Sequence, residues 1–514
     1  MVLATTLVAA PRARSSPTQY LTVGDRLEDE LRILDLYPRR DLADRLSLPH
    51  TGSRPLTLAE IEGTGPPLAG PRPEVALSAA RLERVLGRDP APGFVPSLAD
   101  PATPRLFQRS ESGGQAVEVS MGVEGALLTD KVDAGSAVVS GSGLHTRIGV
   151  GFDRWLVFTH LVAGRFANGQ RIADPIVANT DIIILTEDTY LSYTAGSGRW
   201  GTSFGRGRWH WGPGEEGSLL LSKTAAPITA LSMHGSLESF HLTGTILNST
   251  LQTSAGEQLA AHRLEWQPFD ALRVGASEAV RYRSSGWEWP YAIGVFPYAV
   301  AQRLLAQDEP DSTEALHNNI LTSFDVAWRM VPGHRVYGEL LVDDLHSRTR
   351  ANPDKIGWQL GYDGAGMLQR QRLTWGAEVT RVWRYVYTSY FGRVYAAQDR
   401  PLGFLTGPDA LRARARLSWD PNRDWQATLR FTHTEKGENS LDEPYFPGSP
   451  RPDPSTFEGI VERNRDLELE ARFWPSGGID VAVRSTWRHS DNYTHISGAK
   501  NDDWLGAIEL HLVR

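Results

Sequence analysis

The sequence lacks features that would each have indicated a class of protein. It contains no cysteine in 514 residues, which excludes disulfide bonds and cysteine-ligated metal sites. No stretch approaches the roughly 20 consecutive apolar residues that a membrane-spanning helix requires. Acidic residues outnumber basic ones by 61 to 53, whereas nucleic-acid-binding proteins usually carry a basic domain or stripe.

Catalytic motifs are also missing. The chain has neither an HExxH zinc motif nor a GxSxG nucleophile elbow, and its glycines do not have the spacing of a phosphate-binding loop. We therefore expect no metal, no cofactor and no nucleic-acid partner.

Aromatic residues and glycine, in contrast, are abundant. The chain carries 16 Trp, 15 Tyr and 16 Phe beside 49 Gly, although only 40% of its residues are hydrophobic and its mean hydropathy is -0.33. Membrane β-barrels combine these features, because their strands are apolar on one face only and carry aromatic girdles at both membrane interfaces.

The first part of the chain, residues 18–105, is predicted to be helical and rich in loops. Gly24–Pro38 carries leucines at helical spacing, and Thr57–Glu60 has the form of a capping box. A further helix is predicted over Pro73–Leu86. Helices this short make a poor core of their own, so we expect them to pack against a larger unit and partly close it. Residues 1–17 begin with an apolar run and are interpreted as the remainder of a targeting segment.

From about Gln115 onward the hydrophobic period changes from 3.6 to 2, the period of a β-strand. In ALRARARLSWD (Ala410–Asp420), apolar residues fall on one face and arginines on the other. We predict one strand over Leu373–Tyr390 by the same alternation, with Trp383, Tyr385 and Tyr387 on a single face.

Length and repetition favour a barrel over a soluble β-sandwich. At roughly 10 residues per strand and about a dozen per connection, the remaining chain of about 400 residues holds about 18 strands, which enclose a polar lumen. Short turns such as Asp420–Asp424 and long loops such as Thr434–Gly459 give this barrel two unlike ends. A β-propeller or a multi-sandwich protein is the competing fold, but no regular repeat of about 40 residues is visible. We therefore predict an all-β transmembrane barrel of antiparallel strands in the outer membrane over residues 106–514.

Two pairs of adjacent carboxylates are candidate catalytic groups for an envelope hydrolase. Glu215 and Glu216 would point to opposite faces of a strand, and Asp343 and Asp344 have the same geometry. Neither pair presents two acids across a cleft, as glycoside hydrolysis requires. We interpret them as hydrated loop or lumen charges and predict that the protein is not an enzyme.

Aromatic and basic clusters are the candidate ligand-binding features. The aromatic residues of Ser285–Tyr298 could stack on sugar rings or form part of a membrane-interface girdle. The arginines of Ala410–Asp420 could form a charge ladder in the lumen or hold an acidic polysaccharide. The candidate carbohydrate-binding residues are Trp287, Trp289, Tyr291, Arg412, Arg414 and Arg416.

One segment resembles a known family. WGPGEEGSLLLSKTAAPITALSMHG (Trp211–Gly235) is similar to the WGPG and SLLLS segment of the capsule assembly protein Wzi family, and Asn318–Leu345 and Lys355–Gly366 also resemble that family. The motif residues, to which we assign a structural role, are Trp211, Gly212, Pro213, Gly214, Ser218 and Ser222.

The resemblance implies a monomeric outer-membrane barrel of about 18 strands with a small periplasmic helical region. It implies a lectin-like protein that binds capsular or extracellular polysaccharide at the cell surface, with outer-membrane lipid and the capsule export machinery as further partners. The alternative is a porin-like channel with a charged lumen.

Overall fold

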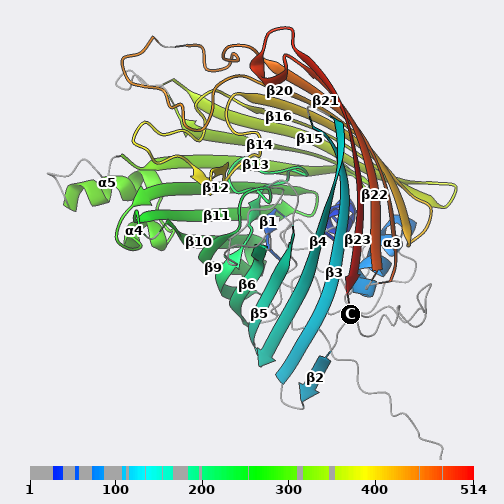
Figure 1. Ribbon diagram of the computed structural model, residues 1–514. Helices are drawn as coiled ribbons and strands as arrows, with labels where there is room; N and C mark the ends of the chain where they lie inside the picture. Colours follow the sequence, from blue (N-terminus) through cyan, green and yellow to red (C-terminus); the bar gives the residue numbers. More distant parts are fainter. Residues whose placement is uncertain are drawn as a thin grey trace, which may run out of the picture.

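The structure is a computed structural model of one chain (Figure 1). It describes residues 27–38, 52–56, 72–85, 107–111, 115–132, 135–152, 154–165, 183–195, 199–252, 254–308, 317–345, 353–450, 452–476 and 479–513. The predicted capping box at Thr57–Glu60 and the predicted targeting segment at residues 1–17 lie outside these ranges.

Strands dominate the described residues. In chain order they are β1 (Ser53–Arg54), β2 (Phe107–Glu111), β3 (Gln115–Val132), β4 (Gly135–Phe152), β5 (Trp155–Arg165), β6 (Ile183–Ala195), β7 (Trp200–Gly207), β8 (His210–Trp211), β9 (Ile228–Leu237), β10 (Leu242–Gln252), β11 (Glu257–Phe269), β12 (Leu272–Arg283), β13 (Asn319–Val331), β14 (His334–Asp344), β15 (Lys355–Leu368), β16 (Gln371–Val382), β17 (Ala396–Ala397), β18 (Arg400–Pro401), β19 (Ala410–Asp420), β20 (Trp425–Lys436), β21 (Glu462–Ser476), β22 (Ile479–Asp491) and β23 (Lys500–Val513). The α-helices are α1 (Leu27–Asp35), α3 (Pro73–Val85), α4 (Trp289–Ala292) and α5 (Tyr298–Asp308), and two short 3-10 helices span Glu238–Phe240 and Tyr493–His495.

Eighteen of the described strands form one antiparallel ring. β3–β7, β9–β16 and β19–β23 each pair with the neighbours before and after them, and β23 pairs with β3, so the order returns to its start and makes a closed barrel. The predicted all-β barrel of about 18 antiparallel strands is confirmed.

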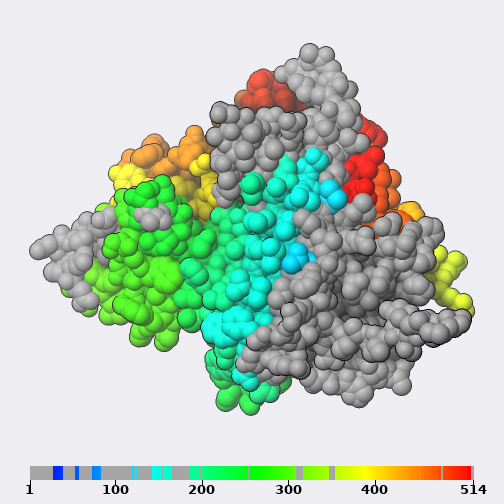
Figure 2. Space-filling view, turned by 60° about the horizontal axis from the view of Figure 1, so that its bottom comes forward, coloured from blue at the N-terminus to red at the C-terminus, as the bar shows by residue number. Residues whose placement is uncertain are grey.

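The two faces of the barrel wall have opposite chemistry. In β13, Phe324, Val326 and Trp328 are exposed on the outside. Ser323 and Asp325, which alternate with them along the strand, are buried toward the lumen. This is the reverse of a soluble sandwich, in which the apolar face is buried, and it suits a wall surrounded by hydrocarbon. The space-filling view shows this wall as a continuous surface from the cyan strands to the green ones (Figure 2).

Exposed tryptophans gather near both ends of the wall. Close to the short turns, the exposed residues are Trp155, Trp200, Trp266, Trp328, Trp419 and Trp425. Near the opposite end, Trp487 of β22 and Trp504 of β23 are exposed and lie side by side as a cross-strand pair. Paired girdles of this kind mark the two interfaces of a membrane.

The two ends of the barrel differ, as the sequence predicts. At one end, turns of a few residues join β11 to β12, β13 to β14 and β19 to β20, and we call it the short-turn end. At the other end, which we call the long-loop end, the chain between β12 and β13 contains α4 and α5, and residues 383–409 and 437–461 form large loops (Figure 1).

The prediction of a single strand over Leu373–Tyr390 is wrong beyond Val382, where β16 ends. Tyr385 and Tyr387 have φ of 65° and 71°, in the left-handed region that no strand contains. The aromatic residues continue at every second position past the strand, but the backbone there belongs to a folded loop in which Val386 between Tyr385 and Tyr387 is buried as well. Tyr387 is fully buried and donates a hydrogen bond from its hydroxyl to the carbonyl of Leu219, 2.6 Å away.

The two described helices of residues 18–105 occur where the leucine spacing predicts them, over Leu27–Asp35 and Pro73–Val85. α1 enters the lumen at the short-turn end, where the backbone N–H of Gly333 donates to the carbonyl of Leu36. None of the described helices is long and apolar enough to cross a membrane.

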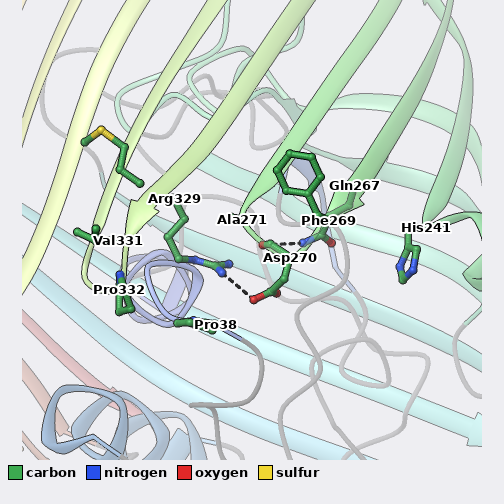
Figure 3. A pocket seen from close by; sticks show the side chains of 10 residues that line it. Pro38, His241, Gln267, Phe269, Asp270, Ala271, Arg329, Val331 and Pro332 are labelled. Atoms are coloured by element: carbon green, nitrogen blue, oxygen red, sulfur yellow. Dashed lines mark hydrogen bonds and ion pairs between the residues drawn. The ribbon is translucent and has the colours of Figure 1, made fainter.

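A cavity of about 690 Å³ lies where the chain leaving α1 meets the short turns. Pro38 and Pro332 both line it, and Figure 3 shows Arg329 of β13 pointing toward Asp270, with which it forms an ion pair at 3.0 Å. The other lining residues are His241, Gln267, Phe269, Ala271, Met330 and Val331.

Candidate functional site

The connection between β7 and β9, residues 208–227, folds into the lumen as an internal plug. It contains the motif segment and the short strand β8, which pairs with β1 of the N-terminal region so that Trp211 lies opposite Ser53. The N–H of Gly212 donates to the carbonyl of Gly52 at 2.8 Å. The N-terminal region and the plug therefore meet inside the barrel.

Hydrogen bonds from the strands hold the backbone of the plug. Glu378 of β16 accepts from the N–H of Glu215 at 2.7 Å, and Glu339 of β14 accepts from the N–H of Leu219 at 3.0 Å. Gln359 of β15 donates its side-chain amide to the carbonyl of Gly217 at 3.2 Å. Three adjacent strands thus fix the path of the plug.

Ion pairs fix the same turn to β19, the next strand of the ring after β16. Glu215 lies 2.9 Å from Arg416, and Glu216 lies 2.5 Å from Arg412. Arg414 lies between them, 3.8 Å from Glu216. The row of arginines predicted from the alternation therefore faces the lumen, where it receives the two carboxylates of the motif.

We expected Glu215 and Glu216 to be hydrated charges, and this is wrong. Their side chains are only 12% and 11% exposed, because the plug is folded against the wall and not into solvent. Burial alone would raise the pKa of Glu215, but the guanidinium groups of Arg416 and Arg414 hold it well below its usual value. Both carboxylates face β19. Adjacent side chains of a strand would point to opposite faces, but the Gly-Pro-Gly turn is not a strand.

The motif requires glycine at two positions because other atoms of the protein approach its backbone closely. Gly212 has φ of 143°, and a Cβ there would lie 2.8 Å from the carboxylate of Glu339. A Cβ on Gly214 would lie 2.0 Å from the carbonyl of Gly217. The structural role assigned to the motif thus has a physical basis.

The remaining motif residues stabilise the turn. Trp211 is 1% exposed and its N–H donates to the carbonyl of Leu221 at 2.9 Å. Ser218 donates from its hydroxyl to the carbonyl of Trp211, and the hydroxyls of Ser222 and Thr224 lie 2.7 Å apart. The carbonyl of Pro213 accepts from the guanidinium of Arg32 in α1 at 2.8 Å.

Buried ion pairs also hold α1. Glu30 accepts from both terminal nitrogens of Arg372 in β16 at 3.0 Å each, and Arg372 in turn binds Asp420 of β19 at 2.8 Å. Asp35 lies 2.5 Å from both Arg273 and Arg335. The lumen of the described strands β12–β19 is therefore filled by α1 from one end and by the plug from the other.

The docking of α1 has an expected pH dependence. Burial tends to raise the pKa values of Glu30 and Asp35, but the arginines that surround each of them lower both well below the ordinary range. A carboxyl whose pKa is lowered on folding contributes stability above its unfolded pKa, about 4, and loses it as the pH falls further. We expect the protection of α1 amides from hydrogen exchange, corrected for intrinsic rates, to stay constant from about pH 8 to 5 and to decline only below about pH 4. A decline already between pH 7 and 5 would contradict this assignment.

A row of aromatic rings crosses the long-loop end. His317 stacks on Phe391 with ring centroids 3.9 Å apart, Phe391 contacts Tyr390 at 5.1 Å, and Tyr390 contacts Phe446 at 5.5 Å. These four side chains, which we call the aromatic row, come from three different loops. Tyr390, Phe391 and Phe446 are 49%, 46% and 55% exposed, and contiguous exposed apolar side chains often mark a binding site.

The loops that carry the aromatic row are braced against each other. Tyr385 donates its N–H to the side chain of Asn439 at 2.9 Å, and the N–H of Glu458 donates to Asp409, also at 2.9 Å. Arg381 donates to the carbonyl of Ser455 at 2.8 Å. These hydrogen bonds between the loops fix the rings before any ligand binds. Less conformational entropy is then lost on binding.

The structure does not bring the predicted carbohydrate-binding residues together. Tyr291 is fully buried, whereas Trp287 and Trp289 are 37% and 78% exposed beside or on α4. The arginines of β19 lie inside the barrel against the plug. Contact of these residues with a glycan stays a prediction.

The sequence reading missed the aromatic row. Its signal was a repeated Tyr-Phe pair followed closely by glycine, at Tyr390–Gly392 and at Tyr445–Gly448. Both pairs stand in loops at the same end of the barrel. That end could be identified from the alternation of short turns and long loops, but contact between the loops depends on the fold.

The candidate hydrolase residues also have structural partners. Asp343, at the end of β14, accepts from the N–H of Tyr387 at 2.6 Å, as Glu215 and Glu216 accept from arginines. In the described part of the chain, no group of three histidine and carboxylate side chains is arranged to hold a metal ion.

Comparison with known proteins agrees with this architecture. Residues 117–505 match the profile of the family described as capsule assembly protein Wzi. The structure is similar to that of Wzi of Escherichia coli, described as an outer membrane protein involved in group 1 capsule assembly and a carbohydrate-binding β-barrel, with a TM-score of 0.61 and 15% identity over 96% of this chain and 99% of that chain.

Weaker structural similarity extends to further solved structures. OccAB1 of Acinetobacter baumannii has a TM-score of 0.45 and 11% identity over 77% of this chain and 96% of that chain. OccD3 of Pseudomonas aeruginosa has a TM-score of 0.43 and 10% identity over 82% and 96% of the two chains. No curated protein sequence matches the chain closely enough to count as a relative.

Proposed function

The chain belongs to the capsule assembly protein Wzi family, and from this premise we propose that it is an outer-membrane protein that binds capsular or extracellular polysaccharide at the cell surface. The observation that carries the proposal is the exposed aromatic row on braced loops at the long-loop end, above a lumen filled by the plug and α1. Aromatic faces stack on the apolar faces of sugar rings, and an extended row suits a polymer better than a small solute.

The orientation follows from the two ends. The long-loop end faces the outside of the cell, as in other outer-membrane barrels, and the short-turn end with α1 and α3 faces the periplasm. Outer-membrane lipid surrounds the apolar wall. The protein acts as a monomer, since one chain completes the ring of strands, and it receives polymer from the capsule export machinery.

Binding is proposed in place of catalysis. The carboxylates that a hydrolase would use are held in ion pairs or hydrogen bonds within the protein, whereas a general acid or nucleophile must reach the substrate. The porin-like alternative requires an open path, which the plug and α1 obstruct along β12–β19.

Removal of the aromatic row tests the proposal. Tyr390→Ala and Phe446→Ala are each expected to weaken binding of purified capsular polysaccharide by about 1 kcal/mol, or about fivefold in Kd, because each removes a stacking surface. Isothermal titration or a glycan-binding assay on the purified full-length protein measures the change.

Ile496→Ala is the matched control, since Ile496 is 61% exposed in the loop between β22 and β23 and is not part of the aromatic row. Equal affinity in all three variants would refute the assignment of the row. Capsule that stays cell-attached in a deletion strain would refute the proposed function itself.

A further inference from the structure

α4 and α5 lie on the outside of the barrel, not over its mouth. In β11, Arg263 points into the lumen and donates to the hydroxyl of Ser53 at 2.9 Å, so its neighbour His262 points outward. The ring of Tyr298, the first residue of α5, packs against His262 with centroids 4.4 Å apart. Asn248 of β10 donates to the carbonyl of Ala292 at 3.0 Å. In Figure 1 the two helices stand beside the long-loop end of β10–β12.

The patch of wall that these helices cover is unsuited to lipid. Polar residues lie there among apolar ones such as Val280 and Tyr282, whereas the exposed outward residues further along β11, Leu264 and Trp266, are apolar. Glu278 accepts from the N–H of Tyr298 at 2.8 Å and lies 3.4 Å from His262. A carboxylate on the outer wall is costly in hydrocarbon unless its partners are satisfied and it is covered. The polar outward residues of this sector are Asn248, Gln258, His262, Glu278 and Thr322, and the others are Ile246, Ala260, Val280, Tyr282 and Ile320.

The helices cover this patch and present an apolar surface of their own. On the side that faces the wall, Tyr291, Tyr298 and Ala301 are fully buried. The opposite side is apolar and exposed, from 40% at Ile293 to 78% at Trp289. The residues of this outer face are Trp289, Ile293, Val295, Phe296, Val300 and Leu304.

We propose that this outer face of α4 and α5 is a lipid-binding surface that lies among the acyl chains of the outer leaflet. It continues the exposed apolar wall formed by residues such as Leu264 and Val326. An amphipathic helix with an apolar face of this kind lies in the interface plane of a membrane. Exposed Arg303, beside Leu304, supplies a cation that anionic headgroups attract. The inference rests on the membrane placement proposed above. It assigns Trp289 to a membrane-interface girdle and not to stacking on sugar rings.

The absence of cysteine allows a direct test. Single cysteines are introduced by Val295→Cys and Val300→Cys in the full-length protein, labelled with the environment-sensitive fluorophore NBD, and reconstituted in phosphatidylcholine vesicles with or without brominated acyl chains. Val326→Cys on the outer wall serves as the lipid control, and Ile496→Cys serves as the water control. Labels at 295 and 300 are expected to lose emission to the brominated chains as the label at 326 does, whereas the label at 496 keeps its emission.

Labels at 295 and 300 that behave as the label at 496 does, while the label at 326 is quenched, would overturn the inference and leave the barrel in its membrane. An unquenched label at 326 would refute the membrane placement itself, and the inference with it. Emission at 295 that responds to purified capsular polysaccharide and not to brominated lipid would also overturn it, in favour of glycan contact by this segment.

Discussion

Replacement of Arg372 by alanine is expected to release α1 from the lumen. The Arg372 side chain is fully buried and bridges Glu30 of α1 to Asp420 of β19, at 3.0 and 2.8 Å. Without it, Arg81 of α3, 2.7 and 2.9 Å away, is the cation that remains for the two buried carboxylates, beside hydrogen bonds from the neutral side chains of Ser78 and Gln426. Removal of one partner from a buried ion pair costs about 3 to 5 kcal/mol, because the remaining charge is uncompensated.

Hydrogen exchange measures this release. A loss of about 3 kcal/mol in local stability speeds exchange of the α1 amides by about a hundredfold or more. Arg370→Ala is the matched control, since Arg370 is exposed in the adjacent turn. The amides of β13 should exchange at the same rate in both variants, which separates undocking of α1 from unfolding of the barrel. Unchanged exchange in α1 would mean that Arg372 does not hold the helix.

The barrel could be predicted from the sequence because its signal is local. Alternation in stretches such as Ala410–Asp420 depends only on which side of one strand faces lipid, and it repeats often enough to give a strand number. The prediction failed after Val382, where the alternating aromatic residues pack in a loop core with left-handed backbone at Tyr385 and Tyr387. A period of two in the sequence therefore indicates a strand only where the backbone is extended, and in this loop Val386 and Thr388 are as buried as the tyrosines.

The site could be predicted only in part, since it depends on contacts distant in sequence. The resemblance identified the segment from Trp211 to Ser222. It did not predict that the two carboxylates of this segment would fold inward onto β19, roughly 200 residues later. The aromatic row joins three loops between His317 and Phe446, and no spacing rule relates them. The position of α5 outside the wall likewise depends on contacts such as that of Tyr298 with Glu278, and the segment around Glu278 has the local pattern of an ordinary strand.

Charge reversal in the plug is expected to open the lumen. In the double variant Glu215→Lys and Glu216→Lys, two buried attractive contacts with Arg416 and Arg412 become repulsive, and Arg414 adds a third cation nearby. Each pair that is broken costs about 3 to 5 kcal/mol, whereas each hydrogen bond from the wall to the plug contributes only about 1 kcal/mol. The plug should therefore leave the wall, although the antiparallel ring remains intact.

Conductance of single proteins in planar bilayers measures the opening. The unchanged protein is expected to give little steady current, and the double variant clearly more, because the plug no longer fills the space beside β14–β19. Glu509→Lys is the control, since Glu509 faces the lumen from β23, 3.6 Å from Arg484, without contact to the plug. It alters lumen charge but should not open a path. Large steady currents from the unchanged protein would instead favour the porin-like alternative, because a lumen that already conducts needs no release of the plug.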